Sequence, residues 1–390
     1  MSVQTIEGYY FNTKLVIRLT IDRGRLASIE EIEPQEGVLY PCLAPGFFDL
    51  QLNGYAGVDF NRAEPITEAD YLTVADALAA QGYTSFCPTL ITNSPQALEK
   101  RCRELAEILA KNKRLATMTP GFHIEGPYLS PLDGARGAHA REFIHEPDFE
   151  EFKMWYDAAG GRISIVTVSP EWGDAAYSFI AKVRDLGVRV SIGHTMATDI
   201  QVRAAATAGA SLVTHFGNGV PLMVPRHPNF LWEQLAQDRL ACSVIADGFH
   251  LPESVLKTVF RVKGRSTYII SDSTEFGGMK PGTYSSHVGG EVTLTPAGRL
   301  HLAHEPGLLA GSAQSVRHGV AHIASTGILP LKDAWIQAST APAVFLGMEV
   351  HAALMQDAYA NFVEFTYEGG KVHITGTWLH GEKIYKGDVQ

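Results

Sequence analysis

Residues 119–125 read "TPGFHIE", a short apolar run that ends in two ionisable side chains, His123 and Glu125. Seven more runs of β-branched and aromatic residues lie between residues 46 and 273. Runs of this length and composition are typical of buried strands. The seven are "GFFDLQL" (46–52), "TSFCPTL" (84–90), "RISIVTVSP" (162–170), "VRVSIGH" (188–194), "SLVTHF" (211–216), "ACSVIAD" (241–247) and "TYIISDS" (267–273).

Stretches with helical spacing or composition lie between these runs. Five of them are 67–81, 94–112, 174–186, 198–208 and 251–263. This alternation predicts an α/β fold, a (β/α)8 TIM-like barrel. The alternative is a doubly wound open sheet, which normally has a nucleotide-binding loop after its first strand. We favour the barrel because "LNGYAG" (52–57) has neither G-x-G-x-x-G nor Walker spacing.

The two ends of the chain differ from the middle. Alternating apolar and polar residues, typical of half-buried antiparallel strands, occur near both termini. We therefore expect residues 1–44 and 348–390 to form one small β-sandwich domain, with residues 45–347 forming the barrel and a helical tail at 313–347. The alternating stretches are "TKLVIRLTI" (13–21), "GRLASIEEI" (24–32), "NFVEFTY" (361–367), "KVHITGTW" (371–378) and "EKIY" (382–385).

Composition excludes several classes of function. The chain has 32 basic and 42 acidic residues, a net charge of −10, and no Lys/Arg run of the kind that binds a phosphate backbone, so we expect no nucleic-acid partner. No stretch approaches the ~20 apolar residues of a membrane span, and the N-terminus resembles no signal peptide. The four cysteines are scattered, which favours reduced thiols over a disulfide framework or a zinc knuckle. We expect a cytoplasmic protein.

Polar side chains cluster at the ends of the predicted strands, where a barrel of this type has its active site. A single histidine at a strand end usually hydrogen bonds to the backbone. Several ionisable groups converging from different strands are costly to bury unless they are paired or bind a cation. The residues are Gln51 and Asn53, His123 and Glu125, His194, His215, Asp247 and His250, and Asp272.

Three of these residues form a plausible metal-ligand set. Glu125, His194 and His215 supply one carboxylate and two imidazoles, which suit a single Zn²⁺ with a fourth position open for water. Fe²⁺, Co²⁺ and Mn²⁺ accept the same ligands. A metal of this kind lowers the pKa of a bound water toward ~7 and polarises a carbonyl, so the site suits hydrolysis. Asp272 is the candidate general base, with a helix N-cap as its alternative role; we expect His123 to be structural or supporting.

Several segments, in order, resemble the N-acetylglucosamine-6-phosphate deacetylase family of the amidohydrolase superfamily. The resemblance extends from about residue 40 to residue 315, and many separate motifs in order are more specific than any one of them. The segments are "APGFFDLQLNG" (44–54), "HIEGPYLSP" (123–131), "GAH" (137–139), "VTVSPE" (166–171), "IGHT" (192–195), "THFGNGVP" (214–221), "IADGFH" (245–250), "SDS" (271–273) and "LAGS" (309–312).

The resemblance implies roles for individual residues. Glu125, His194 and His215 fall on the family's metal ligands, Asp272 on its general acid/base, and His139 on a residue that contacts the substrate near the scissile amide. Arg226 falls on a phosphate-binding arginine that reaches across a dimer interface in the family, which implies a homodimer. The other implied substrate contacts are Gln51, Asn53, Ala138, Asn218, Gly219, His250, Leu309 and Gly311.

The first strand points to one metal rather than two. Many amidohydrolases have His-x-His here, whereas this chain has Gln51-x-Asn53, and "RISIVTVSP" has no lysine to bridge two ions. The resemblance therefore implies a mononuclear enzyme that removes acetate from N-acetylglucosamine 6-phosphate. It argues against a cyclic amidase or deaminase, and a binding protein on a decayed scaffold would be expected to have lost a ligand or the base.

Other segments depart from the family pattern and leave the substrate open. The usual Asn-Ala-Met reads Asn218-Gly219-Val220, and residues 227–229 and 273–290, which include Glu275, also differ. The alternatives are another N-acyl amino sugar, such as N-acetylgalactosamine 6-phosphate, or an amidohydrolase of another class. His318 and His322 are four residues apart on an expected helix, where we predict a satisfied or solvated face.

Overall fold

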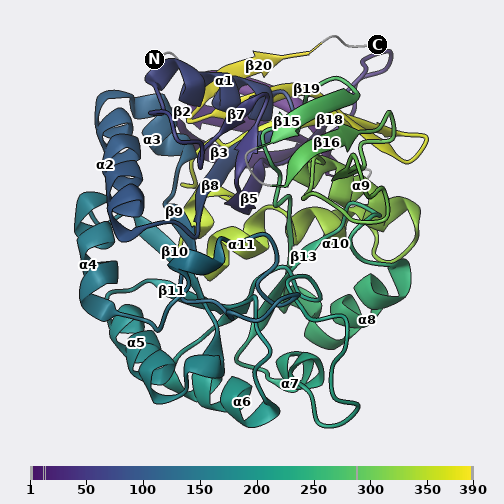
Figure 1. Cartoon of the computed structure of the whole chain (residues 1–390). Helices are drawn as coiled ribbons and strands as arrows, with labels where there is room; N and C mark the ends of the chain where they lie inside the picture. The colour runs from purple at the N-terminus through teal and green to yellow at the C-terminus, as the bar shows by residue number, and fades with distance from the viewer. Residues whose placement is uncertain (1–2, 12, 14, 287–288, 388–390) are drawn as a thin grey trace.

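The computed structural model describes residues 3–11, 13, 15–286 and 289–387 (Figure 1). At its centre, eight parallel strands lie in the order β14-β13-β12-β11-β10-β9-β8-β5. The two ends of this order meet, because the Asp272 amide donates to the Gln51 carbonyl over 3.0 Å and Leu52 forms a parallel bridge with Ser273. The predicted (β/α)8 barrel is confirmed. Its strands are β5 (Phe47–Leu52), β8 (Tyr83–Ile91), β9 (Phe122–Glu125), β10 (Ile163–Val168), β11 (Arg189–Ile192), β12 (Leu212–Val213), β13 (Ala241–Ile245) and β14 (Thr267–Ile270).

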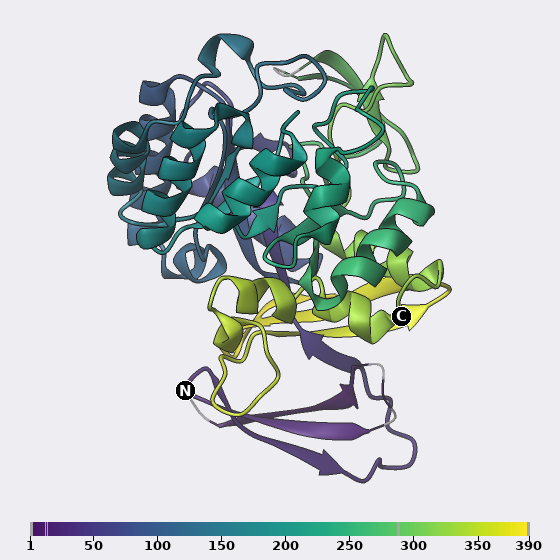
Figure 2. The ribbon, with the colours of Figure 1, turned by 90° about the horizontal axis from the view of Figure 1, so that it is seen from below.

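Helices surround the barrel (Figures 1 and 2). Two of them, α1 and α6, begin with a capping box, in which Thr67 pairs with Asp70 and Thr198 with Gln201. These hydrogen bonds fix the residue at which each helix starts. The helices are α1 (Glu68–Ala79), α2 (Pro95–Lys111), α3 (Lys113–Met118), α4 (Phe149–Ala158), α5 (Asp174–Asp185), α6 (Asp199–Ala208), α7 (Phe230–Ala236), α8 (Glu253–Lys263), α9 (Val316–Ser325), α10 (Leu331–Ile336) and α11 (Thr340–Phe345). No helix among these described residues is long and apolar enough to cross a membrane.

The N-terminal ends of the barrel strands are closed by apolar side chains. Phe48, Leu50 and Ile165 are buried in one cluster with Ala343 of α11. The predicted tail at 313–347 is helical, although it is divided into the three short helices α9, α10 and α11. Apolar packing fills this end, and the candidate site residues lie at the opposite end of the barrel, where the strands have their C-terminal ends.

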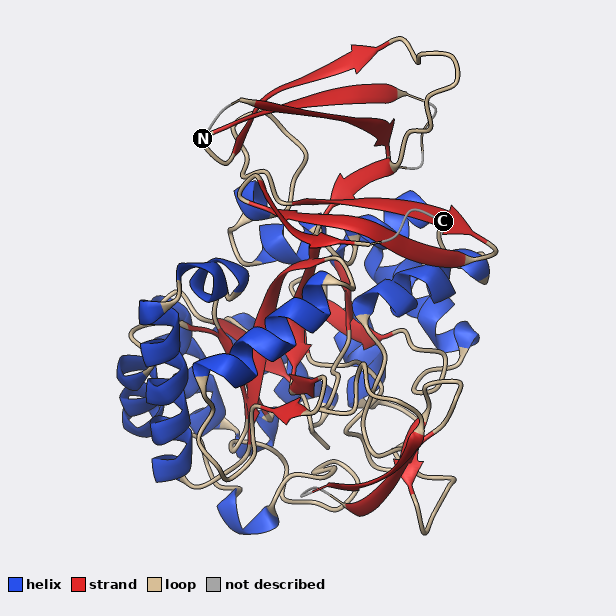
Figure 3. Ribbon diagram, turned by 90° about the horizontal axis from the view of Figure 1, so that it is seen from above, coloured by secondary structure: helices blue, strands red, loops and turns tan. Residues whose placement is uncertain are grey.

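Both termini contribute to a second, seven-stranded sheet, as predicted. Figures 2 and 3 show it beside the barrel, with the C-terminal strands nearer the barrel than the N-terminal ones. Trp335 of α10 joins the two parts, since its ring stacks on Phe47 of the barrel at 4.5 Å and on Phe365 of the sheet at 4.3 Å. The strand order is β20 (Glu382–Lys386), β19 (Lys371–Leu379), β18 (Phe362–Glu368), β4 (Cys42–Pro45), β1 (Gln4–Tyr10), β2 (Val16–Asp22) and β3 (Arg25–Ile32).

Division of the chain at residues 44 and 347 stays a prediction. The strand β4 continues across the first of these positions to Pro45, so sheet and barrel are linked without a separate linker. Residues 1–2 and 388–390 of the predicted β domain lie outside the described residues.

A small three-stranded sheet follows β14, which the sequence did not predict. It consists of β15 (Gly282–Ser286), β16 (Gly290–Leu294) and β17 (Leu300–Leu302), on the side of the barrel away from the terminal sheet (Figure 3). Phe276 is buried in one apolar cluster with Val292 of β16 and Leu300 of β17. The described part of the divergent segment 273–290 therefore contributes β15 and the first residue of β16 to this sheet, and residues 287–288 lie outside the described residues.

Candidate active site

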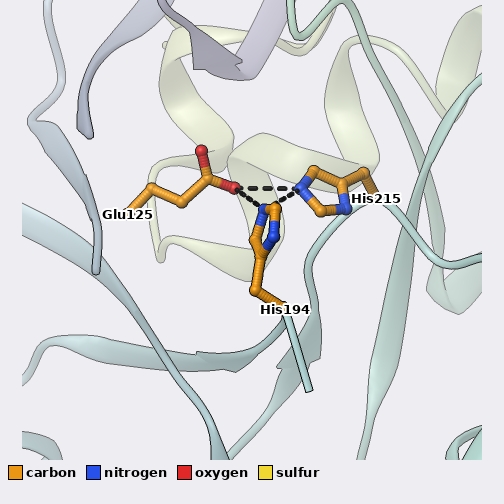
Figure 4. A group of neighbouring side chains, drawn as sticks. All are labelled: Glu125, His194 and His215. Atoms are coloured by element: carbon orange, nitrogen blue, oxygen red, sulfur yellow. Dashed lines mark hydrogen bonds and ion pairs between the residues drawn. The ribbon is translucent and has the colours of Figure 1, made fainter. Parts of the chain in front are cut away.

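Three side chains meet in the mouth of the barrel. Glu125 ends β9, and His194 and His215 follow β11 and β12. The Oε1 atom of Glu125 lies 2.9 Å from His215 Nε2 and 3.4 Å from His194 Nε2, and the two Nε2 atoms are 3.0 Å apart (Figure 4). All three residues are buried, and their donor atoms lie within 4.8 Å of one another. This donor set fits a divalent metal with an open coordination position.

The backbone turns these side chains into the mouth. His194, His215 and Asp272 have φ of 48°, 30° and 47°, in the left-handed region that side-chain-bearing residues rarely adopt. The strands end just before each of them, which is why β12 is only Leu212–Val213 although the sequence predicted a strand to residue 216. Such conformations cost roughly 1–3 kcal/mol each and persist where the surroundings enforce them.

Neighbouring groups hold the proposed ligands in place. The His194 Nδ1–H donates to the Ala135 carbonyl over 3.0 Å, and the Gln51 amide donates to Glu125 Oε1 over 2.9 Å. Burial alone would raise the pKa of Glu125, but contacts with His194 and His215 hold that pKa well below its ordinary value. Gln51, from the first barrel strand, thus lies against the carboxylate of Glu125.

His123 does not join this group. Residues two apart on a strand share a face, so it lies on the same side of β9 as Glu125 but deeper in the barrel. Its Nδ1 is 3.2 Å from the Leu50 carbonyl and its Nε2 is 2.8 Å from Thr167 Oγ1. Burial lowers the pKa of His123 to about 4, so the ring is neutral. These contacts agree with a structural role.

Asp272 lies beside the triad. The Asn53 amide donates to Asp272 Oδ1 over 2.8 Å. Burial, and then the negative charge of Glu125, raise the pKa of Asp272 to about 6, while His215 and His250 lower it. A carboxyl group that titrates near neutral pH suits general acid/base catalysis. The N-cap alternative for Asp272 is wrong, because the next element is the strand β15.

His139 lies in the loop after β9, close to the group formed by Glu125, His194 and His215. Its Nε2 is 3.2 Å from His194 Nε2, and its Nδ1 is 2.9 Å from Thr92 Oγ1. Burial, and then the charge of His194, lower the pKa of His139 to about 3, so its ring is neutral. A neutral imidazole next to the proposed ligands can hydrogen bond to a substrate oxygen.

A second histidine, His250, is held by an aspartate. Its Nδ1 is 2.7 Å from Asp247 Oδ2, and the other oxygen of Asp247 accepts from the backbone amides of Phe249 and His250 over 2.8 and 2.9 Å. Burial by itself would raise the pKa of Asp247, but these bonds keep that pKa below its ordinary value. The carboxylate therefore fixes the orientation of the His250 ring.

The remaining residues expected to bind substrate lie on the loops around the mouth. Asn218 donates to the His215 carbonyl over 3.2 Å, and Gly311 packs against Thr274 in the loop that follows Asp272. Ala138 and Arg226 are exposed and Leu309 is half-buried. In the part of the chain that the structure describes, the Arg226 side chain forms no hydrogen bond to Glu125, His194 or His215.

Gly219 packs directly against a proposed metal ligand. Its φ is 60°, and a Cβ atom at this position would lie only 2.6 Å from His194 Nδ1. Both the backbone conformation and the close approach of the loop to the imidazole therefore favour glycine at this position.

The sequence reading missed Thr92 and the Ala135 carbonyl. Thr92 directly follows β8 and is buried, so inspecting the end of the second predicted strand would have found it. The Ala135 carbonyl belongs to a loop, and no side-chain pattern indicates a backbone acceptor.

The fold and the site together define an amidohydrolase, a barrel enzyme that hydrolyses an amide bond at a buried carboxylate–imidazole centre. The N-acetylglucosamine-6-phosphate deacetylase of Bacillus subtilis (strain 168) is 34% identical to this chain over 316 residues, which cover 78% of this chain and 76% of that protein. The chain belongs to the N-acetylglucosamine-6-phosphate deacetylase family.

Two further comparisons agree with this assignment. The deacetylase of the same name from Bos taurus is 29% identical over 353 residues, covering 88% of this chain and 83% of that protein. The structure of a variant N-acetyl-D-glucosamine-6-phosphate deacetylase from Mycobacterium smegmatis, in complex with N-acetyl-D-glucosamine-6-phosphate, matches with a TM-score of 0.86 at 27% identity, covering 98% of this chain and 100% of that one. No protein-family model matches the chain.

Proposed function

We propose that this protein hydrolyses the N-acetyl amide of N-acetylglucosamine 6-phosphate, releasing acetate and glucosamine 6-phosphate. The observation that carries the proposal is the convergence of the buried group Glu125, His194 and His215 with Asp272, close enough for the charge of Glu125 to raise the pKa of Asp272. Family membership supports the substrate, since the relatives carry that name.

The proposed mechanism gives each residue one task. A divalent metal held by Glu125, His194 and His215 would polarise the amide carbonyl and acidify a water molecule. Asp272 takes a proton from the attacking water as the water oxygen forms a bond to the acetyl carbon. Asp272 then returns that proton to the nitrogen as the C–N bond breaks, so that a neutral amine and acetic acid result, and the acid releases its remaining proton to give acetate. His139 hydrogen bonds to the carbonyl oxygen as negative charge develops there.

The loops around the mouth would select the sugar. Arg226 is exposed, and its planar guanidinium suits a phosphate group. Asn218, Gly219 and His250 would contact the sugar and its phosphate. Burial and the charge of Asp59 raise the pKa of Glu275 to about 7, which reduces the negative charge near a dianionic substrate.

The same proposal includes the finer properties expected from the sequence. Zn²⁺ is the proposed metal because two imidazoles and one carboxylate are a common catalytic zinc set. A homodimer is proposed through the role of Arg226 in the family. A cytoplasmic location agrees with the four cysteines, none of which forms a disulfide within the described residues.

Amine release by the purified protein tests the proposal. The protein is stripped with a chelator, reloaded with Zn²⁺, Fe²⁺, Co²⁺ or Mn²⁺, and assayed with N-acetylglucosamine 6-phosphate, N-acetylgalactosamine 6-phosphate and unphosphorylated N-acetylglucosamine. We expect metal-dependent activity that is highest with the first substrate. Higher activity with the galactosamine derivative would replace the substrate assignment, and metal-independent activity would contradict the mechanism.

A further inference from the structure

We propose that Glu171 is a positioning residue for the candidate metal centre, because its carboxylate anchors the chain that follows His194 and so keeps the imidazole directed at the other two ligands. This inference rests on the proposed function for the role of His194. Glu171 ends the segment "VTVSPE" (166–171), which resembles the family pattern but supplies no residue to the proposed mechanism. It follows β10, the strand that pairs with β11 in the barrel.

The backbone at His194 needs support from its surroundings. Its φ of 48° lies in the left-handed region, which is unfavourable for a residue with a side chain. The His194 carbonyl accepts from the Ser130 amide over 2.9 Å, and the ring is held at Nδ1 by the Ala135 carbonyl. Both of these contacts come from the loop after β9. They do not hold residues 195–198, which connect His194 to α6.

Glu171 bonds directly to this connection. Its Oε2 accepts from the Met196 backbone amide over 2.8 Å and from the Thr195 hydroxyl over 3.3 Å. The hydroxyl of Ser169, a fully buried residue, donates to the same oxygen over 2.8 Å. One carboxylate oxygen thus gathers donors from the ends of two neighbouring strands. Hydrogen bonds to a charged acceptor are stronger than those between neutral groups, so this anchor can hold the backbone beside a strained residue.

A purely local role for Glu171 does not account for these contacts. The 3₁₀ turn at Pro170–Trp172 is capped by Ser169, whose Oγ accepts from the Glu171 amide. The helix α6 has its own capping box, formed by Thr198 and Gln201. The carboxylate of Glu171 therefore caps neither element. It bonds to the chain between them, next to the candidate ligand.

Zinc affinity measures whether this anchor supports the centre. Glu171→Ala removes the acceptor of the Met196 amide, and we expect the purified variant to bind Zn²⁺ roughly 10- to 100-fold more weakly, the usual cost of losing a partner that supports a ligand. Glu171→Gln keeps an acceptor oxygen at the same position without the charge, so its zinc affinity should stay within about fivefold of the wild type. A Glu171→Ala protein with wild-type zinc affinity would overturn the inference.

Glu364→Ala is the matched control for the loss of a carboxylate. Glu364 lies in β18 of the terminal sheet, where it accepts from the Trp378 indole over 2.6 Å and from the Lys383 ammonium over 3.0 Å. Its removal should lower the thermal unfolding temperature but leave zinc affinity within about twofold of the wild type, because distant sites act independently. An equal loss of zinc affinity in Glu364→Ala and Glu171→Ala would mean that general destabilisation explains the effect, and the positioning role would be wrong.

The cobalt-loaded protein tests the geometry of the centre itself, since the visible absorption of Co²⁺ depends on the number and arrangement of its ligands. At saturating Co²⁺, Glu171→Ala should change the positions and intensities of the bands, whereas Glu171→Gln and Glu364→Ala should reproduce the wild-type spectrum. Identical spectra in all four proteins would contradict the inference. A wild type that binds neither zinc nor cobalt would refute the proposed metal centre and this inference with it, whereas normal metal binding by Glu171→Ala would refute the positioning role alone.

Discussion

The candidate metal centre (Glu125, His194 and His215) and the loop at residues 217–228 are in contact but are held in different ways. Glu125, His194 and His215 are at most 7% exposed, and each has a polar contact within the centre. Leu222 and Met223 at the tip of the loop are 101% and 81% exposed. The departures from the family pattern at Gly219 and 227–229 fall in the loop or at its end, where Asn229 caps α7, whereas the centre retains every expected residue. We therefore expect substitutions in the loop to affect substrate choice more than the reaction.

Replacing a ligand in the centre should have the largest effect. Glu125→Ala removes the only carboxylate of the proposed metal site, so we expect loss of bound metal and at least about a 10³-fold loss of kcat/KM. Metal analysis of the purified variant checks the first part, with Arg226→Ala as a control that should bind metal like the wild type. A Glu125→Ala protein that kept both metal and activity would refute the assignment.

Replacing the base should separate chemistry from metal binding. Asp272→Asn keeps the shape of the side chain and the contact with Asn53, so we expect normal metal content but a kcat about 10²–10⁴-fold lower. The two measurements are metal analysis and steady-state kinetics on one preparation. Normal turnover in this variant would mean that another group transfers the proton.

The sequence predicted the centre better than its surroundings, for physical reasons. Burying a carboxylate or an imidazole at a strand end is costly, so Glu125, His194 and His215 stand out in apolar runs. Their partners do not: Thr92 is a common residue in strands, and the Ala135 carbonyl has no sequence signal. The barrel was likewise predictable from eight apolar runs, because each strand is buried on both faces.

The small sheet β15–β17 could not be predicted from the sequence pattern. Its strands "GTYSS" (282–286) and "GEVTL" (290–294) are short, and the first has few apolar residues. Its buried residues Val292 and Leu300 pack with Phe276, which precedes the sheet in the chain. Such packing between residues distant in sequence leaves no local pattern. The same holds for the loop at 217–228, whose conformation depends on the approach of Gly219 to His194.

In the loop, loss of the arginine should affect binding more than turnover. Arg226→Ala removes a charged hydrogen-bond donor worth about 1.5–3 kcal/mol, so KM for N-acetylglucosamine 6-phosphate should rise roughly 10- to 100-fold. The kcat should stay within about threefold, since Arg226 has no contact with Asp272. Unphosphorylated N-acetylglucosamine is the control substrate, and an equal loss of kcat/KM with both sugars would contradict a phosphate contact.

Replacing Asn53, which donates a hydrogen bond to Asp272, should change the pH dependence of kcat/KM. A base with a pKa of about 6 must be deprotonated to act, so kcat/KM should fall as the pH drops through about 6. The hydrogen bond from Asn53 lowers the pKa of Asp272, so Asn53→Ala should raise that pKa and move the acidic limb to higher pH. An unchanged or lower limb would show that another group controls the profile.

The smallest effect is expected where the loop touches the centre. Gly219→Ala adds a Cβ against His194 at a φ of 60°, whereas Gly160→Ala adds one at a φ of 62° with no atom within 4 Å. Both should lose about 1 kcal/mol of unfolding free energy from backbone strain alone. Only Gly219→Ala should also displace the imidazole, weakening metal affinity by up to about 10-fold, the lower end of the cost of disturbing a ligand's support. Thermal unfolding and zinc titration of both variants measure the difference, and equal zinc affinities would show that the loop moves away and leaves the centre intact.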